Sequence, residues 1–438
     1  MLFRKSLLVC GLTLAACQSQ AAGLMDLYKE TLASDPRLAV AAAQVEVSEA
    51  RQRQSFANLL PQVSASAQWT DNKREAGTAT DHYKGERYSV NVNQSVFDKA
   101  RWENNSRYGY LSEQSELEYQ DTRSGLAVDV LERYVAVLAA QDNLELIRAE
   151  REAISKQLEQ LRSRYKRQLA VLTDVLDVEA RLDGVRAQEI VARNDVSIAR
   201  ESLAELVGRE VDEPLNSFAQ KIDYAEDGRP LAHWIKVARS NNPSLLALSA
   251  NIDAERASVR EARAGHLPTV DMSLSALKSD IGFDNTNNPT SETYVAGLTV
   301  NVPLFSGGST SARVDEAHAL LVVAEKRREE QKRAVLKGVR EAYLNTESSL
   351  ARIAAAEKAV MSARKSYQAM QKGFKYGTVT VVDVLDALRD EYSFRRDYRQ
   401  AQYDFAVSRM SLLQASGTLS QNDLLEVNGW LSVENSVN

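Results

Sequence analysis

The sequence predicts a mostly α-helical fold that is internally duplicated and includes two β-hairpins. Long helices are favoured, because aromatic residues make up only 7% of the 438 residues and the chain contains 8 prolines. Matching residues also recur at a nearly constant spacing: Leu60-Pro61 is followed 207 residues later by Leu267-Pro268, and Gly208 is followed 209 residues later by Gly417. Apolar and polar residues alternate in four short segments, as is typical of strands.

Each copy is predicted to contain a helix, two strands, a very long helix, a tight turn and a further helix. The spacing of the matched residues assigns residues 23–208 to the first copy and residues 231–417 to the second. Residues 209–230 and 418–438 follow the two copies, and we interpret both segments as a belt around the equator of the helical part.

Residues 1–22 are predicted to be an export signal. Two basic residues precede the apolar run from Leu7 to Ala16, and small residues end the segment at Ala21 and Ala22. The residues up to Cys17 also fit a bacterial lipobox, in which Cys17 would become the acylated N-terminus. Both alternatives place the mature protein outside the cytoplasm.

The strands follow a Leu-Pro step in each copy. In the first copy they are predicted at about residues 62–70 and 87–97, with a polar, charged stretch between them, and in the second at about 269–278 and 292–304. A half-buried hairpin in a soluble domain would show the same alternation of apolar and polar residues. Strands of about 9 to 11 residues also suit a tilted crossing of an outer membrane, and we favour that interpretation.

Aromatic residues gather at or near the ends of the predicted strands. Such residues form girdles at the two surfaces of a membrane, where their amphipathic rings meet the lipid headgroups. The sequence therefore predicts a lipid-facing girdle made of Trp69, Tyr83, Tyr88, Phe97, Tyr294 and Phe305.

The long helices are predicted to form coiled coils. Between Asp98 and Gln168 the chain has no proline and almost no glycine, so a helix of about 65 residues would be about 100 Å long. Apolar residues in both copies follow the spacing of three and four that packs one helix against another.

Residues that carry catalysis or bind a metal are missing from the sequence pattern. The histidines have no metal-ligand spacing, and we find no phosphate loop, nucleophile elbow or triad, so we expect neither an enzyme nor a cofactor or metal site. The net charge of −6, without a basic block, argues against nucleic acid as a partner. The four histidines are His82, His233, His266 and His318.

Two pairs of acidic residues stand at equivalent turns of the two copies. Asp383 and Asp386 are three residues apart and share one face of a helix, and Asp174 and Asp177 repeat the pattern 209 residues earlier. Acidic residues in the first turn of a helix often act as caps, and Thr380 with Asp383 fits a capping box. Rings of carboxylates at a constriction also favour cations, which is the interpretation we prefer for the repeated pairs.

A chain with four membrane strands must associate with further copies. An open four-stranded sheet leaves unpaired backbone groups that find no partner in lipid. Two copies would give eight strands, whose interior side chains fill the bore, whereas three copies give twelve strands and room for a channel. The alternative is a periplasmic coiled-coil adaptor or scaffold without a pore, whose hairpins pack in a soluble domain.

The layout of the chain resembles the TolC family of outer-membrane channel proteins. The similarity rests on the Leu-Pro steps at Pro61 and Pro268 and on the segments 297–308 and 378–386, and it covers nearly the whole mature chain. It implies a homotrimer in the outer membrane of a Gram-negative bacterium, with a twelve-stranded barrel continuous with a tunnel of twelve helices that extends into the periplasm.

The resemblance also implies partners. Family members dock onto a periplasmic adaptor, or membrane fusion protein, and an inner-membrane transporter of the ABC or RND type, and they export drugs or, in type I secretion, proteins. We expect the same partners here, together with outer-membrane lipid.

The resemblance further implies a periplasmic aperture at the equivalent turns. In the family the acidic pair narrows this entrance, which corresponds here to Asp383 and Asp386. Well-known members close it with polar links from a Tyr and an Arg, but these positions are Phe374 and Val379 here, facing Thr173 and Asp174. Because Phe and Val cannot form such links, we expect closure to depend on packing and on the acid rings.

Overall fold

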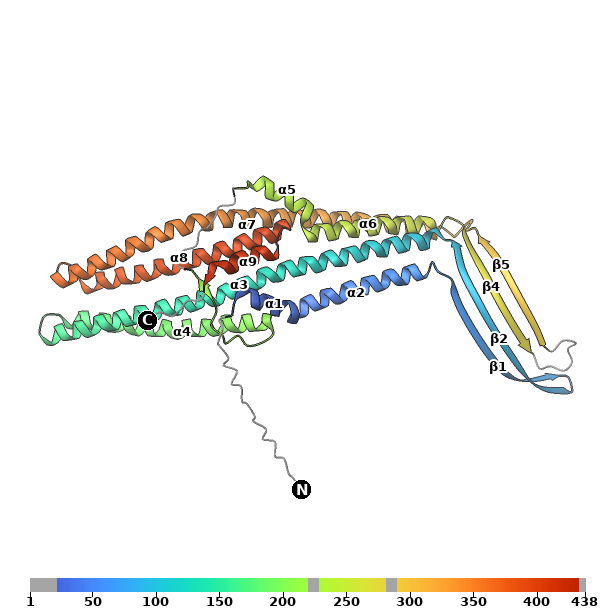
Figure 1. Ribbon diagram of the computed structural model, residues 1–438, viewed down its shortest axis with the longest axis horizontal. Helices are drawn as coiled ribbons and strands as arrows, with labels where there is room; N and C mark the ends of the chain where they lie inside the picture. Colours follow the sequence, from blue (N-terminus) through green and yellow to red (C-terminus); the bar gives the residue numbers. More distant parts are fainter. Residues whose placement is uncertain (1–21, 220–227, 281–289, 433–438) are drawn as a thin grey trace, which may run out of the picture.

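A computed structural model describes residues 22–219, 228–280 and 290–432. The chain is elongated, with a β-sheet at one end, two helical tips at the other and short elements around the middle (Figure 1). Cys17 and all of the predicted export signal except Ala22 lie outside the described residues.

The helices of the two copies correspond in length. Those of the first copy are α1 (Leu24–Ser34), α2 (Pro36–Ala57), α3 (Lys99–Lys166) and α4 (Leu172–Val207), and those of the second are α5 (Leu231–Asn241), α6 (Pro243–Ala264), α7 (Ser309–Tyr376) and α8 (Val381–Ser416). Their lengths are 11, 22, 68 and 36 residues in both copies. The predicted duplication is therefore confirmed. No helix among the described residues has the length and apolar character that a membrane span requires.

The first predicted helix of each copy is two helices in the structure. Asp35 and Asn242 have extended backbone conformations, each precedes a proline, and each side chain accepts a hydrogen bond from a backbone N–H of the next helix. A proline suits the first position of a helix but lacks the N–H that would continue the helix before it. The chain therefore breaks and begins a new helix at the same place in each copy.

Both hairpins belong to one antiparallel sheet. The strands are β1 (Gln62–Ala76), β2 (Ala79–Phe97), β4 (Thr269–Asp280) and β5 (Thr290–Asn301), in the order β1-β2-β4-β5. Only β2 and β4 have a partner on both sides, so β1 and β5 are open edges in a single chain.

The strand bounds differ from the predictions in two places. The two strands of the first hairpin continue beyond their predicted ends near residues 70 and 87 to a tight turn at Gly77, because the backbone of the charged stretch pairs in register up to Ala76 and Ala79. The strand β5 ends at Asn301 rather than near residue 304, because Pro303 has no N–H to donate to a neighbouring strand. Most of the loop predicted between β4 and β5 lies outside the described residues.

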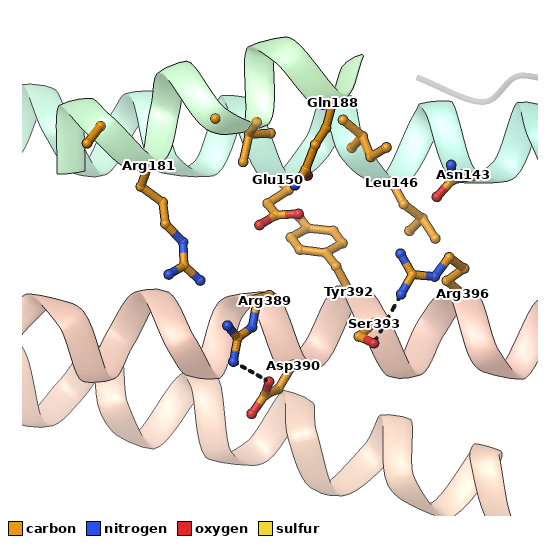
Figure 2. Close-up of a pocket in the computed structure, with 14 residues that line it drawn as sticks. Asn143, Leu146, Glu150, Arg181, Gln188, Arg389, Asp390, Tyr392, Ser393 and Arg396 are labelled. Atoms are coloured by element: carbon orange, nitrogen blue, oxygen red, sulfur yellow. Dashed lines mark hydrogen bonds and ion pairs between the residues drawn. The ribbon is translucent and has the colours of Figure 1, made fainter. Parts of the chain in front are cut away.

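The long helices pack as two coiled coils, α3 with α4 and α7 with α8 (Figure 1). Near the tips, Val381, Leu385 and Leu388 of α8 join apolar side chains of the other coil in one buried cluster. Farther from the tips a partly open cavity of about 520 Å³ lies between the coils, lined by charged, polar and apolar side chains from α3, α4 and α8 (Figure 2).

Short elements surround the middle of the molecule. The predicted belt segments contribute the strand β3 (Ser217–Phe218), the helix α9 (Gln421–Trp430) and the strand β6 (Leu431–Ser432), and β3 pairs with β6. The fully buried Tyr134 of α3 donates its hydroxyl to the carbonyl oxygen of Asn216 at 2.8 Å. The belt segments are thus tied to each other and to the largest apolar core; residues 220–227 and 433–438 lie outside the described part.

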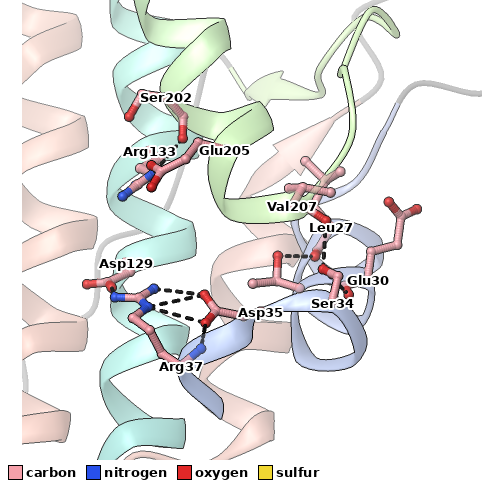
Figure 3. Close-up of polar contacts among 11 residues, drawn as sticks. Leu27, Glu30, Ser34, Asp35, Arg37, Asp129, Arg133, Ser202, Glu205 and Val207 are labelled. Atoms are coloured by element: carbon pink, nitrogen blue, oxygen red, sulfur yellow. Dashed lines mark hydrogen bonds and ion pairs between the residues drawn. The ribbon is translucent and has the colours of Figure 1, made fainter. Parts of the chain in front are cut away.

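Polar contacts fix the first copy where α1 meets α2 and α3 (Figure 3). The Arg37 guanidinium bridges Asp35, at 2.9 Å, and Asp129 of α3, at 2.8 Å. Burial of Asp35 opposes ionisation, but the hydrogen bonds and charge of Arg37 hold the pKa of this carboxyl below its ordinary value. Nearby, Arg133 of α3 pairs with Glu205 of α4.

The cap at Asp35 yields a stability prediction. Asp35→Ala removes the cap and should lower the free energy of unfolding by about 1 kcal/mol, whereas Asp35→Asn should cost less because Asn also caps a helix, as Asn242 does in the second copy. Thermal unfolding followed by circular dichroism compares the two variants, and equal losses would contradict this assignment.

The same site predicts a pH dependence. Because the folded pKa of Asp35 lies below its ordinary value of 3.8, its contribution is present above that pH and is lost as the pH falls through the folded pKa. Asp35→Asn should therefore lose less stability than the wild type when thermal unfolding is measured below about pH 4.

Candidate functional site

The sheet separates apolar from polar side chains across all four strands. Val63 of β1 stands opposite Val92 of β2, which stands opposite Leu274 of β4, which in turn stands opposite Ala296 of β5. Because neighbours opposite each other project to the same side, one face of the sheet is apolar. The next row of opposed residues along the strands lies on the other face of the sheet and is mostly polar. It consists of Ser64, Asn91, Ser275 and Val295.

Two levels of aromatic side chains border the apolar face. Trp69 and Tyr88 pack edge to face at 5.9 Å, and Tyr294, which is 78% exposed, lies toward the same end of the sheet. At the helical end, Phe97 packs edge to face on Trp102 at 5.4 Å, and Phe305 follows β5. The ten residues from Tyr88 to Phe97 span roughly 30 Å of strand, which suits the tilted crossing of an apolar layer.

A β-bulge puts Phe97 on the apolar face. The pairing of β2 with β4 shifts between Ser95 and Phe97, so that Phe97 stands opposite Val270. Without the extra residue Phe97 would project to the polar side, because side chains alternate along a strand. Trp69, Tyr88, Tyr294 and Phe97 thus lie toward the two ends of the apolar face. Tyr83 lies in the extended part of the hairpin, and Phe305 lies beyond the end of β5.

The two helical tips have the same turn with different residues. At the tip between α7 and α8, Gly377 has a φ of 76°. The equivalent residue between α3 and α4, 209 positions earlier, is Gln168, which has a φ of 62°. Left-handed backbone is unfavourable for residues other than Gly, so the first tip carries local strain that the second lacks. In both, a backbone N–H after the turn bonds a carbonyl five residues earlier, that of Arg164 or Gly373.

The predicted acidic residues lie just beyond these turns, on α4 and α8. Thr380 and Asp383 form a reciprocal capping box, as expected, and the Thr380 hydrogen bonds hold the pKa of Asp383 below its ordinary value. Asp174 lies in the uncapped first turn of α4. Among the described residues of this single chain, no three acidic or histidine side chains converge to hold a metal.

Asp386 has a partner that sequence reasoning did not identify. Arg181 of α4 reaches across to α8, and its Nη1 lies 3.4 Å from Asp386 Oδ1. The pair joins residues that are 205 positions apart in the sequence and belong to different coils. No local sequence motif predicts this contact. Asp386 remains 47% exposed at the level of the side chain.

A second arginine contacts the ring of Phe374. The guanidinium of Arg164 lies over the Phe374 ring, with Cζ 4.6 Å from the ring centroid, which is a favourable cation–π geometry. Val379 packs close to Gly373, and Thr173 is exposed. Phe374 therefore contacts the other coil, through an interaction that its aromatic ring allows and that the sequence prediction lacked.

Comparison with known proteins identifies the chain. The sequence profile described as outer membrane efflux protein matches residues 27–209 and 234–418, one segment in each copy. The chain belongs to this family. As a member of the outer membrane efflux proteins, also called the TolC family, it is a non-enzymatic outer-membrane exit duct for efflux or type I secretion, and the alternative of a scaffold without a pore is set aside.

The chain is similar to TolC proteins over nearly its full length. It is 32% identical over 416 residues to outer membrane protein TolC of Vibrio cholerae, covering 94% of each chain. It is 31% identical over 445 residues to TolC of Escherichia coli, covering 98% of this chain and 90% of that one.

Solved structures share the fold of this TolC-family chain. A structure of CusC has a TM-score of 0.79 at 17% identity and covers 91% of this chain and 95% of its own. The outer membrane protein VceC of Vibrio cholerae has a TM-score of 0.77 at 20% identity, covering 90% and 96%. The predicted fold class is thus confirmed.

The two faces of the sheet give a prediction for this TolC-family member. Val92 lies on the apolar face midway between the two aromatic levels, opposite Val63 and Leu274, and Asn91 lies next to it on the polar face. Val92→Lys should cost about 2–4 kcal/mol in the membrane and reduce the protein recovered in the outer-membrane fraction, whereas Asn91→Lys should leave the amount unchanged. Equal loss in both variants would contradict the assignment of the faces.

Proposed function

We propose that three copies of the chain assemble into one duct, with a twelve-stranded barrel continuous with a tunnel of twelve helices. The observation that carries the proposal is the four-stranded sheet with an apolar face and two open edges, β1 and β5. Backbone N–H and C=O groups in lipid need partners, and the edge of one copy supplies them to the edge of the next. Three copies give the twelve strands that leave room for a channel.

Exposed apolar side chains on the outer helices support this assembly. In a single chain α3 packs against α6, and by the duplication the equivalent partner of α7 is α2 of a neighbouring copy. Both α2 and α7 carry exposed apolar residues: Val40, Val47 and Phe56 on α2, and Leu320, Val322 and Val323 on α7. Burying them between copies provides an apolar driving force for closing the ring.

We propose that the tips form the periplasmic aperture. The residues assigned to it are Asp174, Asp177, Thr173, Phe374, Val379, Asp383 and Asp386. Three copies would repeat the acidic pairs around the entrance, and such rings favour cations. The belt segments 209–230 and 418–438 would encircle the tunnel at its equator, which the pairing of β3 with β6 supports.

We assign the tips to contact with a periplasmic adaptor and an inner-membrane transporter, of the ABC or RND type. Two relatives carry names that refer to secretion and to efflux systems, in which such partners would be needed: the alkaline protease secretion protein AprF of Pseudomonas aeruginosa, 31% identical over 422 residues, and the cation efflux system protein CusC of Escherichia coli. The duct would accept either an exported protein or a small molecule, according to the transporter that feeds it.

Planar-bilayer recording tests the duct and its aperture. Purified protein should migrate as a heat-sensitive trimer and form cation-selective channels, and Asp383→Asn should lower the K⁺/Cl⁻ permeability ratio at least about twofold. Asp397→Asn makes the same charge change on α8 about 20 Å farther from the tip and should leave the ratio unchanged. A monomer without channel activity would overturn the proposed assembly, and equal ratios in both variants would overturn the aperture.

A further inference from the structure

An ion pair links the two coiled coils beside the proposed aperture. Arg181 of α4 and Asp386 of α8 lie 3.4 Å apart, with side chains 29% and 47% exposed. The pair lies next to the apolar cluster in which Val381, Leu385 and Leu388 of α8 meet the other coil. Separating the coils at the tips would therefore separate these two charges.

Arg181 reaches Asp386 from the other coil. Its Nη2 is buried and has no hydrogen-bond partner among the described residues, and its Nη1 pairs with Asp386. Figure 2 shows the side chain extending from α4 toward α8 at one end of the cavity between the coils. Because the Arg181 side chain extends from α4 across to α8, its positive charge compensates the negative charge of Asp386.

A second carboxylate lies within reach of Arg181 on the same coil. Glu150 of α3 lines the same cavity, and burial raises the pKa of its carboxyl, while the charges of Arg181, Arg396 and Arg389 oppose that rise. Ser393 accepts a hydrogen bond from Arg396, and Arg389 pairs with Asp390. Glu150 and Arg181 belong to the same coil, so this electrostatic interaction stays in place when α8 moves away.

We propose that Arg181 determines the charge of the aperture by shielding Asp386 while the coils touch and releasing it when they separate. This inference rests on the proposed duct. In the closed arrangement only Asp383 of the α8 pair presents an uncompensated charge, because Asp386 is paired. In the open arrangement both carboxylates face the passage, so the entrance attracts cations more strongly as it widens.

The strength of the pair suits a reversible contact. A partly exposed ion pair contributes little to stability in water and is screened by salt. The cavity behind it is lined by both charged and apolar side chains and is large enough to admit water. The ion pair itself can thus break at little cost, while the neighbouring apolar cluster supplies the packing between the coils.

The decisive experiment compares Arg181→Gln with a matched charge change on the same helix. Arg186 lies five residues farther along α4, is 59% exposed and pairs within its own helix with Asp183 at 2.9 Å. In full-length protein reconstituted in planar bilayers, Arg181→Gln should raise single-channel conductance and raise the K⁺/Cl⁻ permeability ratio roughly twofold, because the uncompensated charge of each α8 pair doubles. Arg186→Gln should change neither.

A double variant separates the ion pair from long-range electrostatics. Asp386→Asn alone should raise conductance but lower the permeability ratio, and adding Arg181→Gln should then raise conductance no further, because the pair is already broken. Arg181→Lys should keep conductance near that of the wild type. The heat-sensitive trimer is measured for every variant, so that loss of assembly is distinguished from a change in the aperture.

Two results would overturn the inference while leaving the duct intact. One is that Arg186→Gln changes conductance and permeability as much as Arg181→Gln does. The other is that the effects of Arg181→Gln and Asp386→Asn on conductance add independently. A wild-type protein that forms no channel would instead count against the proposed duct itself.

Discussion

The structure depends on the backbone hydrogen bonds at the edges of a four-stranded sheet. Within one chain, β1 and β5 each pair on one side only, and one face of the sheet is apolar. An unpaired edge in lipid is costly because no water is present to satisfy its backbone groups. In the proposed assembly, further copies would close the sheet and satisfy both edges, and they would bring the long helices of those copies together at the same time.

Much of the fold follows from local patterns that a single sequence contains. The Leu-Pro steps, the alternation along the strands and the glycines after the long helices locate most elements, because each pattern acts within a few residues. The strands around Gly77 could not be predicted from apolar alternation, because their residues are mostly charged or polar. Their pairing continues the register of the neighbouring part of the hairpin. The break at Asp35 was missed because helical residues flank it on both sides.

The candidate aperture was predictable in position but not in its contacts. The repeated acidic pairs mark the two tips, and the capping box at Thr380 and Asp383 is a local motif that the structure confirms. The partner of Asp386 could not be found this way, because Arg181 belongs to another coil and meets it only through packing. The same holds for Arg164, whose place over Phe374 depends on how the two coils lie together.

The first hairpin continues well beyond Trp69 and Tyr88 as a charged ribbon, and a Cβ added at Gly77 in its turn would meet no other atom. The second hairpin has no such extension among the described residues. In the proposed assembly these ribbons rise from the rim on the side away from the periplasm. A short peptide inserted at Gly77 would thus be presented to the surroundings of the cell, which makes this turn a natural place for a surface label.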